Sequence, residues 1–213
     1  MRVQVQQQQR EYDGFFKLDH AVLRFERFDG RLSAPVERLV FERGDSIAVL
    51  LYDEERDAVI LVEQFRYPAY LREKPHGRLL EVVAGTMQEG DEGRAEEVAR
   101  SELIEEAGYA LRELEHITTF YVSPGACTER IHLYLGRVSR DARVGPGGGV
   151  GEGEDIRVHE LPLDRALHWL REGKIRDAKT IIALQYLALR NGIATQRSQR
   201  AQSEYGKSLR SLR

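Results

Sequence analysis

Residues 85–109 read GTMQEGDEGRAEEVARSELIEEAGY, and this stretch decides the fold. Its second half, residues 95–107, has helical composition and precedes Gly108, a residue type that commonly ends helices. At α-helical spacing, three carboxylates at i, i+3 and i+4 would share one face: Glu102, Glu105 and Glu106. Their repulsion, about 0.2–0.5 kcal/mol per pair, would be offset by binding of hard divalent cations, which prefer carboxylate oxygens.

The composition describes a single domain with appendages. The chain has 213 residues, of which 41% are hydrophobic, enough for one sizeable core. Its 32 Lys and Arg nearly balance 35 Asp and Glu, so no global field would attract nucleic acid or an anionic membrane. The lone Cys127 excludes an internal disulfide, and the polar N-terminus has no signal-peptide core. With no apolar run near the roughly 18 residues of a membrane span, we expect a cytoplasmic protein.

The order of predicted elements favours an α+β arrangement over alternating βαβ units. Strands are predicted, from β-branched and aromatic content between turn signals, at residues 15–18, 21–28, 36–42, 47–52, 58–65, 79–84, 117–121, 131–138 and 156–160. Two later helices are expected, one over residues 163–172 and one from Asp177, as a cap, to a stop at Asn191-Gly192. The glycine-rich stretch 145–153 has too few side chains to pack a core, so we expect a mobile loop there.

The stretch quoted above resembles the Nudix box. A bare Glu-x-x-Glu-Glu helix is more often a solvated face, but here a strand ending in Gly85, an acidic turn, the glutamate helix and a terminal Ala-Gly-Tyr follow in the order of the box. Two departures are visible. The segment between the box glycine and the helix is two residues longer, so that Asp91 or Glu92 stands for the first acidic residue, and Ser101 replaces the arginine that orients the box carboxylates.

Flanking motifs make the chain similar to bacterial ADP-ribose pyrophosphatases. Pro124 lies sixteen positions after Gly108, the spacing typical of that group, and further similar segments follow in the right order: Phe41–Gly44, Val62–Tyr67, Glu152–Val158 and Gly173–Asp177. The resemblance implies an α+β Nudix fold, mixed β-sheets sandwiched between helices, with an N-terminal antiparallel β extension used in dimerisation. We expect a disordered polar N-terminus over residues 1–11, the β-strand dimerisation region over 12–45, the Nudix hydrolase domain over 46–192 and a disordered polar tail over 193–213.

The resemblance also implies the site. Magnesium, with Mn²⁺ as a substitute, would be bound by the Ala84 carbonyl and four carboxylates: Glu102, Glu105, Glu106 and Glu154. Glu152 would be the general base and Glu105 a second catalytic residue, with the glycine loop closing over substrate. Acidic residues that merely keep a glycine-rich linker soluble are the alternative for the loop pair. Substrate contacts are implied for Phe15, Arg38, Arg66 and Glu129, with the adenine stacked on an aromatic face and a guanidinium. In a homodimer, some of these contacts would come from the second subunit.

The predicted function is Mg²⁺-dependent hydrolysis of the diphosphate of ADP-ribose to AMP and ribose 5-phosphate. A GDP-mannose or other nucleotide-sugar pyrophosphatase on the same fold is the first alternative, since the segments Gly147–Val150 and Arg176–Thr180 do not discriminate between the two. A sensor that binds ADP-ribose without cutting it is the second. Such modules typically lose box glutamates, which are all present here. The expected partners are a small nucleoside diphosphate-linked substrate and a second copy of the chain.

Overall fold

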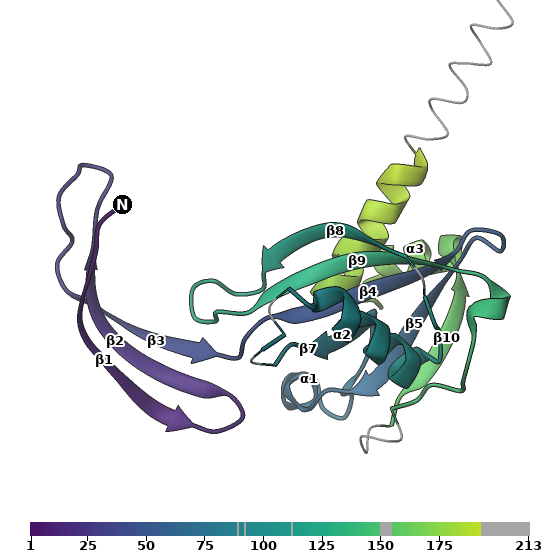
Figure 1. Ribbon diagram of the computed structural model, residues 1–213, viewed down its shortest axis with the longest axis horizontal. Coiled ribbons are helices and arrows are strands. Elements are labelled where there is room, and N and C mark those ends of the chain that lie inside the picture. Colours follow the sequence, from purple (N-terminus) through teal and green to yellow (C-terminus); the bar gives the residue numbers. More distant parts are fainter. Residues whose placement is uncertain (89, 92, 112, 150–154, 193–213) are drawn as a thin grey trace, which may run out of the picture.

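The structure is a computed structural model that describes residues 1–88, 90–91, 93–111, 113–149 and 155–192 (Figure 1). Its strands are β1 (Val3–Asp13), β2 (Lys17–Phe25), β3 (Val36–Glu42), β4 (Ser46–Asp53), β5 (Ala58–Phe65), β6 (Arg78–Glu81), β7 (Val83–Thr86), β8 (Leu114–Tyr121), β9 (Arg130–Val138) and β10 (Arg157–Pro162). Its helical elements are α1 (Tyr67–Arg72), α2 (Ala95–Glu102), the π-helical turn η1 (Leu103–Ala107), the 3-10 turn η2 (Arg140–Ala142) and α3 (Leu163–Arg171). A last helix, here called the C-terminal helix, covers residues 178–192.

The first three strands form an antiparallel sheet that extends away from the rest of the molecule as an arm (Figure 1). β1 pairs with β2 along its whole length, from Val3 opposite Phe25 to Asp13 opposite Lys17. The expectation of a disordered N-terminus over residues 1–11 is therefore wrong. Every residue of β1 is exposed, so backbone pairing rather than a buried face stabilises the strand. Its Gln-rich sequence lacks the sustained apolar alternation that predicts a strand.

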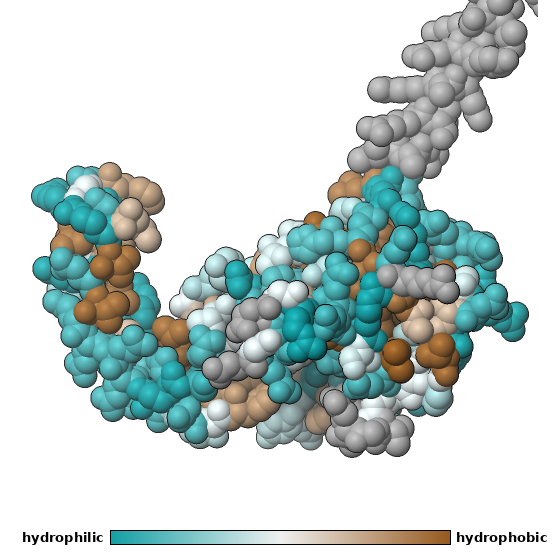
Figure 2. All heavy atoms as spheres, viewed as in Figure 1, coloured by the Kyte–Doolittle hydropathy of each residue, from teal (hydrophilic) through white to brown (hydrophobic). Residues whose placement is uncertain are grey.

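The arm carries apolar side chains that this chain leaves exposed. Directly paired residues share a face of the sheet, and one face has an apolar row across all three strands: Val3, Val5, Leu23, Phe25 and Val36. Val3 and Val5 are each at least half exposed. Figure 2 shows apolar residues along the arm. An exposed apolar row of this kind is a candidate interaction surface.

The second sheet builds the body of the molecule around β4. Its strand order is β10-β5-β4-β9-β8, with β6 on β5 and β7 on β4. β4 is buried at every residue and runs parallel to β9. Its odd-numbered side chains enter one core, Ile47, Val49 and Leu51, and its even-numbered ones enter the other, Ala48, Leu50 and Tyr52. A strand buried on both faces reads as a continuous apolar run, as this one does.

Helices cover both faces of this sheet. The first core packs against α2 and η1, and the second against α3 and the C-terminal helix, through Leu184 and Leu187 among others. The predicted α+β fold, with mixed strands sandwiched between helices, is confirmed. Asp177 caps the C-terminal helix as predicted, since its Oδ2 accepts the Thr180 N–H at 2.9 Å. Helix α1 was not predicted, because it is one short, exposed turn after Arg66 with no apolar periodicity.

The predicted strand over residues 79–84 is divided in two at Val82. β6 pairs with β5 as far as Glu81, and β7 pairs with β4 from Val83 onward. The chain thus leaves one neighbour for another within a single apolar run, which periodicity cannot reveal. Among the helices described, none is long and apolar enough to cross a membrane.

Candidate active site

The glutamate helix lies on the sheet through a small apolar stripe. Ala99, Leu103 and Ala107 are fully buried in the core beneath it. The helix is α-helical only as far as Glu102 and then widens into the π turn η1, before Gly108 ends it at φ 76°. The helix predicted over residues 95–107 thus has the predicted limits, but its last five residues are π-helical rather than α-helical. Single π turns inside α-helices occur frequently at functional sites.

The three box carboxylates differ in their burial and in their contacts. Glu102 projects toward β7, where a Cβ added at Gly85 would collide with its carboxylate. Glu106 is 5% exposed, and its Oε2 lies 3.4 Å from the Ala84 nitrogen. Glu105 is exposed instead, and its Oε1 accepts a 2.8 Å hydrogen bond from Ser101. A π turn takes more residues than an α turn, so the α-helical spacing from which one shared face was predicted does not hold over Leu103–Ala107.

The donor set suits a hard divalent cation in part. Glu102 and Glu106 approach the same strand segment, Glu106 at the Ala84 N–H and Glu102 at Gly85, and carboxylate oxygens are ligands that such ions prefer. Among the described residues, no group of three or more His, Cys, Asp or Glu side chains lies close enough to hold a metal ion. Glu152 and Glu154, the predicted base and fourth carboxylate, lie outside the described residues. The two converging glutamates are therefore the part of the predicted metal site that the structure brings together.

The glycine-rich segment is held against the end of this helix. The Gly148 N–H donates to the Glu106 carbonyl at 2.8 Å, and the Gly149 N–H donates to the Glu105 carbonyl at 3.1 Å. Helix C-termini leave such carbonyls without intrahelical partners, so the loop satisfies them. These backbone contacts lie within the stretch where we expected a mobile loop, of which residues 150–153 lie outside the described residues.

Arg66 lies at the start of α1 and is bound to a buried carboxylate. Its Nε and Nη2 donate to the two oxygens of Glu81 at 2.8 and 3.1 Å, a bidentate arrangement that fixes the guanidinium plane. Lys179 also contacts Glu81, at 3.2 Å, and Asp177, at 2.7 Å. Burial alone would lower the pKa of Lys179, but the charges of Asp177 and Glu81 raise it above its ordinary value. Lys179 is therefore charged at neutral pH.

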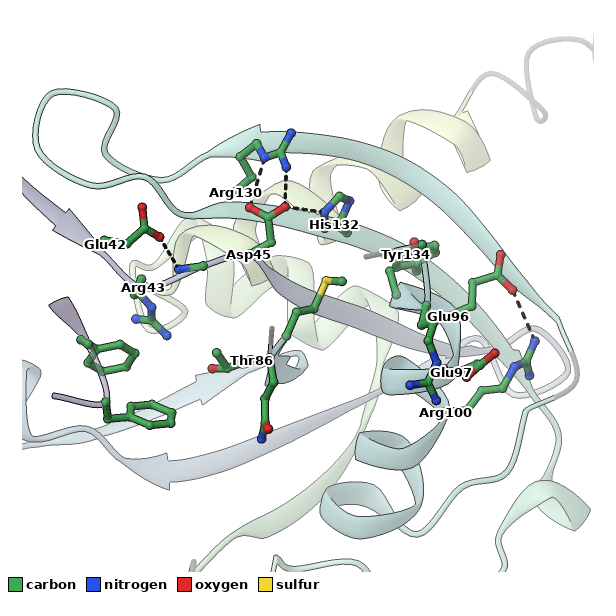
Figure 3. A pocket seen from close by; sticks show the side chains of 18 of the residues that line it. Glu42, Arg43, Asp45, Thr86, Glu96, Glu97, Arg100, Arg130, His132 and Tyr134 are labelled. Carbon is green, nitrogen blue, oxygen red and sulfur yellow. Dashed lines mark hydrogen bonds and ion pairs between the residues drawn. The ribbon is translucent and has the colours of Figure 1, made fainter. Parts of the chain in front are cut away.

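A cavity of about 1220 Å³ opens where the arm joins the body (Figure 3). Phe15 lines it, together with Thr86 at the end of β7 and the first turns of α2, at Glu96 and Arg100. The box glutamates are not among its described lining residues. Within one chain, the predicted stacking aromatic and the carboxylates therefore do not line the same cavity.

An acidic and two basic side chains form a cluster on one wall of this cavity. Asp45 accepts hydrogen bonds from Arg130, at 2.6 and 3.1 Å, and from His132, at 3.1 Å (Figure 3). Partial burial would raise the pKa of Asp45, but these two partners lower it below its ordinary value. The cluster joins the start of β4 to β9, so it fixes the wall of the cavity beside the linker to the arm.

The remaining predicted substrate residues are dispersed. Arg38 is exposed on β3, where its Nη1 donates to the Glu37 carbonyl at 2.7 Å. Glu129 is buried at the root of the arm, where it accepts a 2.7 Å hydrogen bond from Ser46 and lies 3.4 Å from Arg43. Within one chain, Glu129 therefore acts as an internal link between the arm and the body.

Sequence reasoning missed the contacts made by the start of the C-terminal helix. Thr180 is fully buried, and its Oγ1 accepts a 2.8 Å hydrogen bond from the Val82 nitrogen at the strand crossing. The segment Arg176–Thr180 was visible as a motif, but nothing in its spacing connects it to residues 98 positions earlier. A buried polar side chain that contacts a strand break can be found only in three dimensions.

Comparison with known proteins gives consistent matches. Residues 42–183 match the NUDIX domain family. The chain is 43% identical over 179 residues to an ADP-ribose pyrophosphatase of Escherichia coli (strain K12), and 84% of each protein is covered. It is 40% identical over 178 residues to a GDP-mannose pyrophosphatase of Cronobacter sakazakii (strain ATCC BAA-894), covering 84% of this chain and 91% of that protein. A crystal structure described as an ADP compounds hydrolase shares the fold, with a TM-score of 0.67, 16% identity and coverage of 92% of this chain and 96% of that one.

Proposed function

The chain belongs to the Nudix family, and from this premise we propose that it hydrolyses the diphosphate linkage of ADP-ribose to AMP and ribose 5-phosphate. One observation carries the proposal. Glu102 and Glu106 of the box approach the Ala84–Gly85 segment from the facing helix, which brings two carboxylates, with their hard oxygen donors, to one strand segment. A diphosphate carries several negative charges, so a site built from carboxylates can accept it only with cations in between.

Nudix hydrolases generally use divalent metal ions, and in this chain the Ala84 carbonyl, Glu102 and Glu106 would hold one. When bound, such an ion neutralises the diphosphate and lowers the pKa of a water molecule. The protein's own part is positional. Burial fixes the Glu106 carboxylate, and the Ser101 hydroxyl orients Glu105, our proposed second catalytic residue. Glu152 remains the proposed general base that accepts the proton of the attacking water, and Glu154 the proposed further ligand.

The base-binding part of the site supports a dimer. Phe15 and Arg38 lie on the arm and do not line one cavity with the carboxylates in a single chain, and the arm exposes an apolar row. We propose that two chains pair through their arms and that the adenine contacts of each site come from both. Arg66, whose guanidinium plane is fixed by its bidentate contact with Glu81, would supply the cationic face for stacking.

A second candidate substrate class is GDP-mannose and other nucleotide sugars, because a relative named for GDP-mannose is almost as similar, at 40% against 43% identity. Purified protein with Mg²⁺ or Mn²⁺ should be incubated with ADP-ribose, GDP-mannose, ADP-glucose and NADH, and the products separated. We expect the highest kcat/KM for ADP-ribose, with AMP and ribose 5-phosphate as products. Preferential cleavage of GDP-mannose would establish the second candidate, and binding of ADP-ribose with no cleavage of any compound would establish a sensor.

Glu106→Gln tests the carboxylate role. The amide keeps the size and the hydrogen-bonding oxygen of Glu106 but removes its charge, so we expect kcat to fall by about a hundredfold or more, the scale of removing one electrostatic stabiliser. Glu113→Gln is the matched control, because Glu113 lies beyond the end of the helix and outside the predicted metal set. Equal activity of the Glu106 variant and the wild type would contradict the proposed metal site.

A further inference from the structure

The chain changes sheet partners at Val82, immediately before the strand of the candidate site. Val82 is fully buried and lies between β6, which pairs with β5, and β7, which pairs with β4. A buried backbone N–H without a partner is costly, so a residue outside the two ladders must accept it. Ala84 and Gly85, which face Glu106 and Glu102, follow two and three residues further on. Any displacement of the crossing would therefore reach the carboxylate site directly.

Thr180 of the C-terminal helix accepts this N–H. The Val82 nitrogen donates to Thr180 Oγ1 at 2.8 Å, and the Thr180 hydroxyl donates to Asp177 Oδ2 at 2.7 Å. Asp177 Oδ2 also accepts the Thr180 N–H at 2.9 Å. A threonine hydroxyl has one proton and two lone pairs, so the bond to Asp177 leaves an acceptor lone pair for Val82. The same side chain thus joins the start of the C-terminal helix to the strand crossing.

Lys179 connects the same helix to the substrate side. It lies between two carboxylates, 2.7 Å from Asp177 and 3.2 Å from Glu81, and the Glu81 carboxylate in turn binds Arg66. The side chain of Glu81 is 2% exposed and that of Lys179 is 15% exposed. Positive and negative charges alternate along the chain of contacts from Arg66 to Asp177. Such a buried network fixes its members when it is complete and becomes unfavourable when one charge is left without its partner.

We propose that Thr180 and Lys179 are positioning residues of the active site. Both belong to the C-terminal helix, on the far face of the sheet, and each fixes a different side of the site. Thr180 fixes the strand that presents Ala84 and Gly85, so it acts on the carboxylate side. Lys179 fixes the Glu81 carboxylate that orients Arg66, so it acts on the substrate side. The inference rests on the proposed hydrolysis and adds to it two residues outside the box. Substitution of Thr180 and substitution of Lys179 should therefore change kcat and KM differently.

Four variants of the full chain separate these effects: Thr180→Val, Thr180→Ser, Lys179→Met and, as control, Lys174→Met, which removes an exposed ion pair with Glu172. In Thr180→Val we expect kcat for ADP-ribose to fall about tenfold or more with little change in KM, as for loss of an orienting contact. Thr180→Ser, which keeps the hydroxyl, should restore kcat. In Lys179→Met we expect KM to rise about tenfold with kcat retained. Urea unfolding gives the folded fraction, and hydrogen exchange of the amides of residues 82–86 reports the strand itself.

Faster exchange of these amides in Thr180→Val but not in Thr180→Ser, with the kinetic split described, supports the inference. Losses in kcat that follow only the folded fraction, or unchanged exchange, overturn it. Should Thr180→Val not fold, Lys179→Met decides, because an unchanged KM overturns the inference and a raised KM with kcat retained supports it. A wild-type protein that cleaves none of the substrates sinks the proposed function instead. The exchange of residues 82–86 then still decides whether Thr180 holds the strand.

Discussion

At the scale of single residues, Ser101 shows how this chain departs from the pattern it resembles. The residue stands at the arginine position of the box, and its hydroxyl donates to Glu105 Oε1 at 2.8 Å across one helical turn. A neutral, short donor thus orients a carboxylate that lies on the π turn. The contact retains orientation but brings no positive charge to the site.

Ser101→Ala tests that contact. Alanine is the better helix former, so the free energy of unfolding should not fall, and a loss of activity would not come from unfolding. We expect kcat to fall about tenfold, the scale of removing a contact that orients a ligand, and Ser101→Thr to retain activity. The measurement is steady-state hydrolysis beside urea unfolding, with Ser139→Ala, an exposed serine outside the site, as control. Full activity of Ser101→Ala would show that Glu105 needs no such partner.

Sequence spacing predicted that Glu102, Glu105 and Glu106 share one face; in the structure Glu102 and Glu106 approach one strand segment and Glu105 is exposed. The prediction assumed 3.6 residues per turn, whereas the winding changes after Glu102. Burial of Leu103 and Ala107 and the hydrogen bonds from the glycine loop accompany that change, and they involve residues about 40 positions away. Local spacing contains no information about contacts of this kind.

At the scale of elements, the glycine loop acts through close packing. Gly147 has φ 69°, and a Cβ added there would overlap the Glu106 carbonyl, the atom that accepts from Gly148. Gly147→Ala should therefore displace the loop from the helix end. We expect a loss of about 1–2 kcal/mol in the free energy of unfolding from the left-handed backbone, and a fall in kcat of about tenfold to a hundredfold from misplacement of the glutamates.

Gly145→Ala is the matched control for this variant. An added Cβ at Gly145 would meet no atom within 4 Å, so stability and kcat should stay close to those of the wild type. If both alanine variants behave alike, the loop acts as a simple linker, and its contacts with Glu105 and Glu106 do not affect catalysis.

The turn between β4 and β5 depends on one buried carboxylate. Asp53 is 1% exposed and accepts hydrogen bonds from Arg56 Nε at 2.6 Å and from two turn amides. Burial would raise the pKa of Asp53, but Arg56 and the amides lower it below its ordinary value. The stabilisation is therefore present above the unfolded pKa, about 3.9, and is lost as the pH falls through the lower folded pKa.

Asp53→Asn should show this dependence. Near pH 7 we expect the free energy of unfolding to fall by about 1 kcal/mol, the difference between charge-assisted and neutral hydrogen bonds. The gap to the wild type should close as the pH is lowered below about 4, as measured by urea unfolding at several pH values. Glu55→Gln, an exposed change in the same turn, should leave stability unchanged throughout. A gap that is independent of pH would show that the Asp53 charge is not involved.

Elements with apolar periodicity were predictable, and those without it were not. β4, β5 and β9 carry continuous or alternating apolar residues and appear close to their predicted limits. β1 and α1 contribute nothing to the core, so their sequences resemble exposed polar segments. The break at Val82 could not be predicted, because the apolar run of residues 79–84 continues across it. Its two halves differ in the strand with which they pair.

At the scale of the whole molecule, the arm decides the proposed assembly. Its apolar row is exposed in the single chain, and a charge placed there would be buried without a partner on pairing. We therefore expect Val5→Lys to convert a dimer into single chains of 24.4 kDa, as measured by light scattering during size-exclusion chromatography. Gln9→Lys, on the opposite face of the same strand, should leave the mass unchanged. A wild-type protein that is already monomeric would contradict the proposed pairing.

The contribution of β4 to both cores has a consequence for how the molecule unfolds. Alternate side chains of this one strand complete both cores, so neither helical layer can melt while the other keeps its packing. Heating should therefore abolish the carboxylate site and the layer behind it in one cooperative step, as in other small domains. A destabilising substitution in the core beneath α3 and the C-terminal helix then shortens the lifetime of the folded enzyme, as one beside the substrate does. It leaves the chemistry of each folded molecule unchanged.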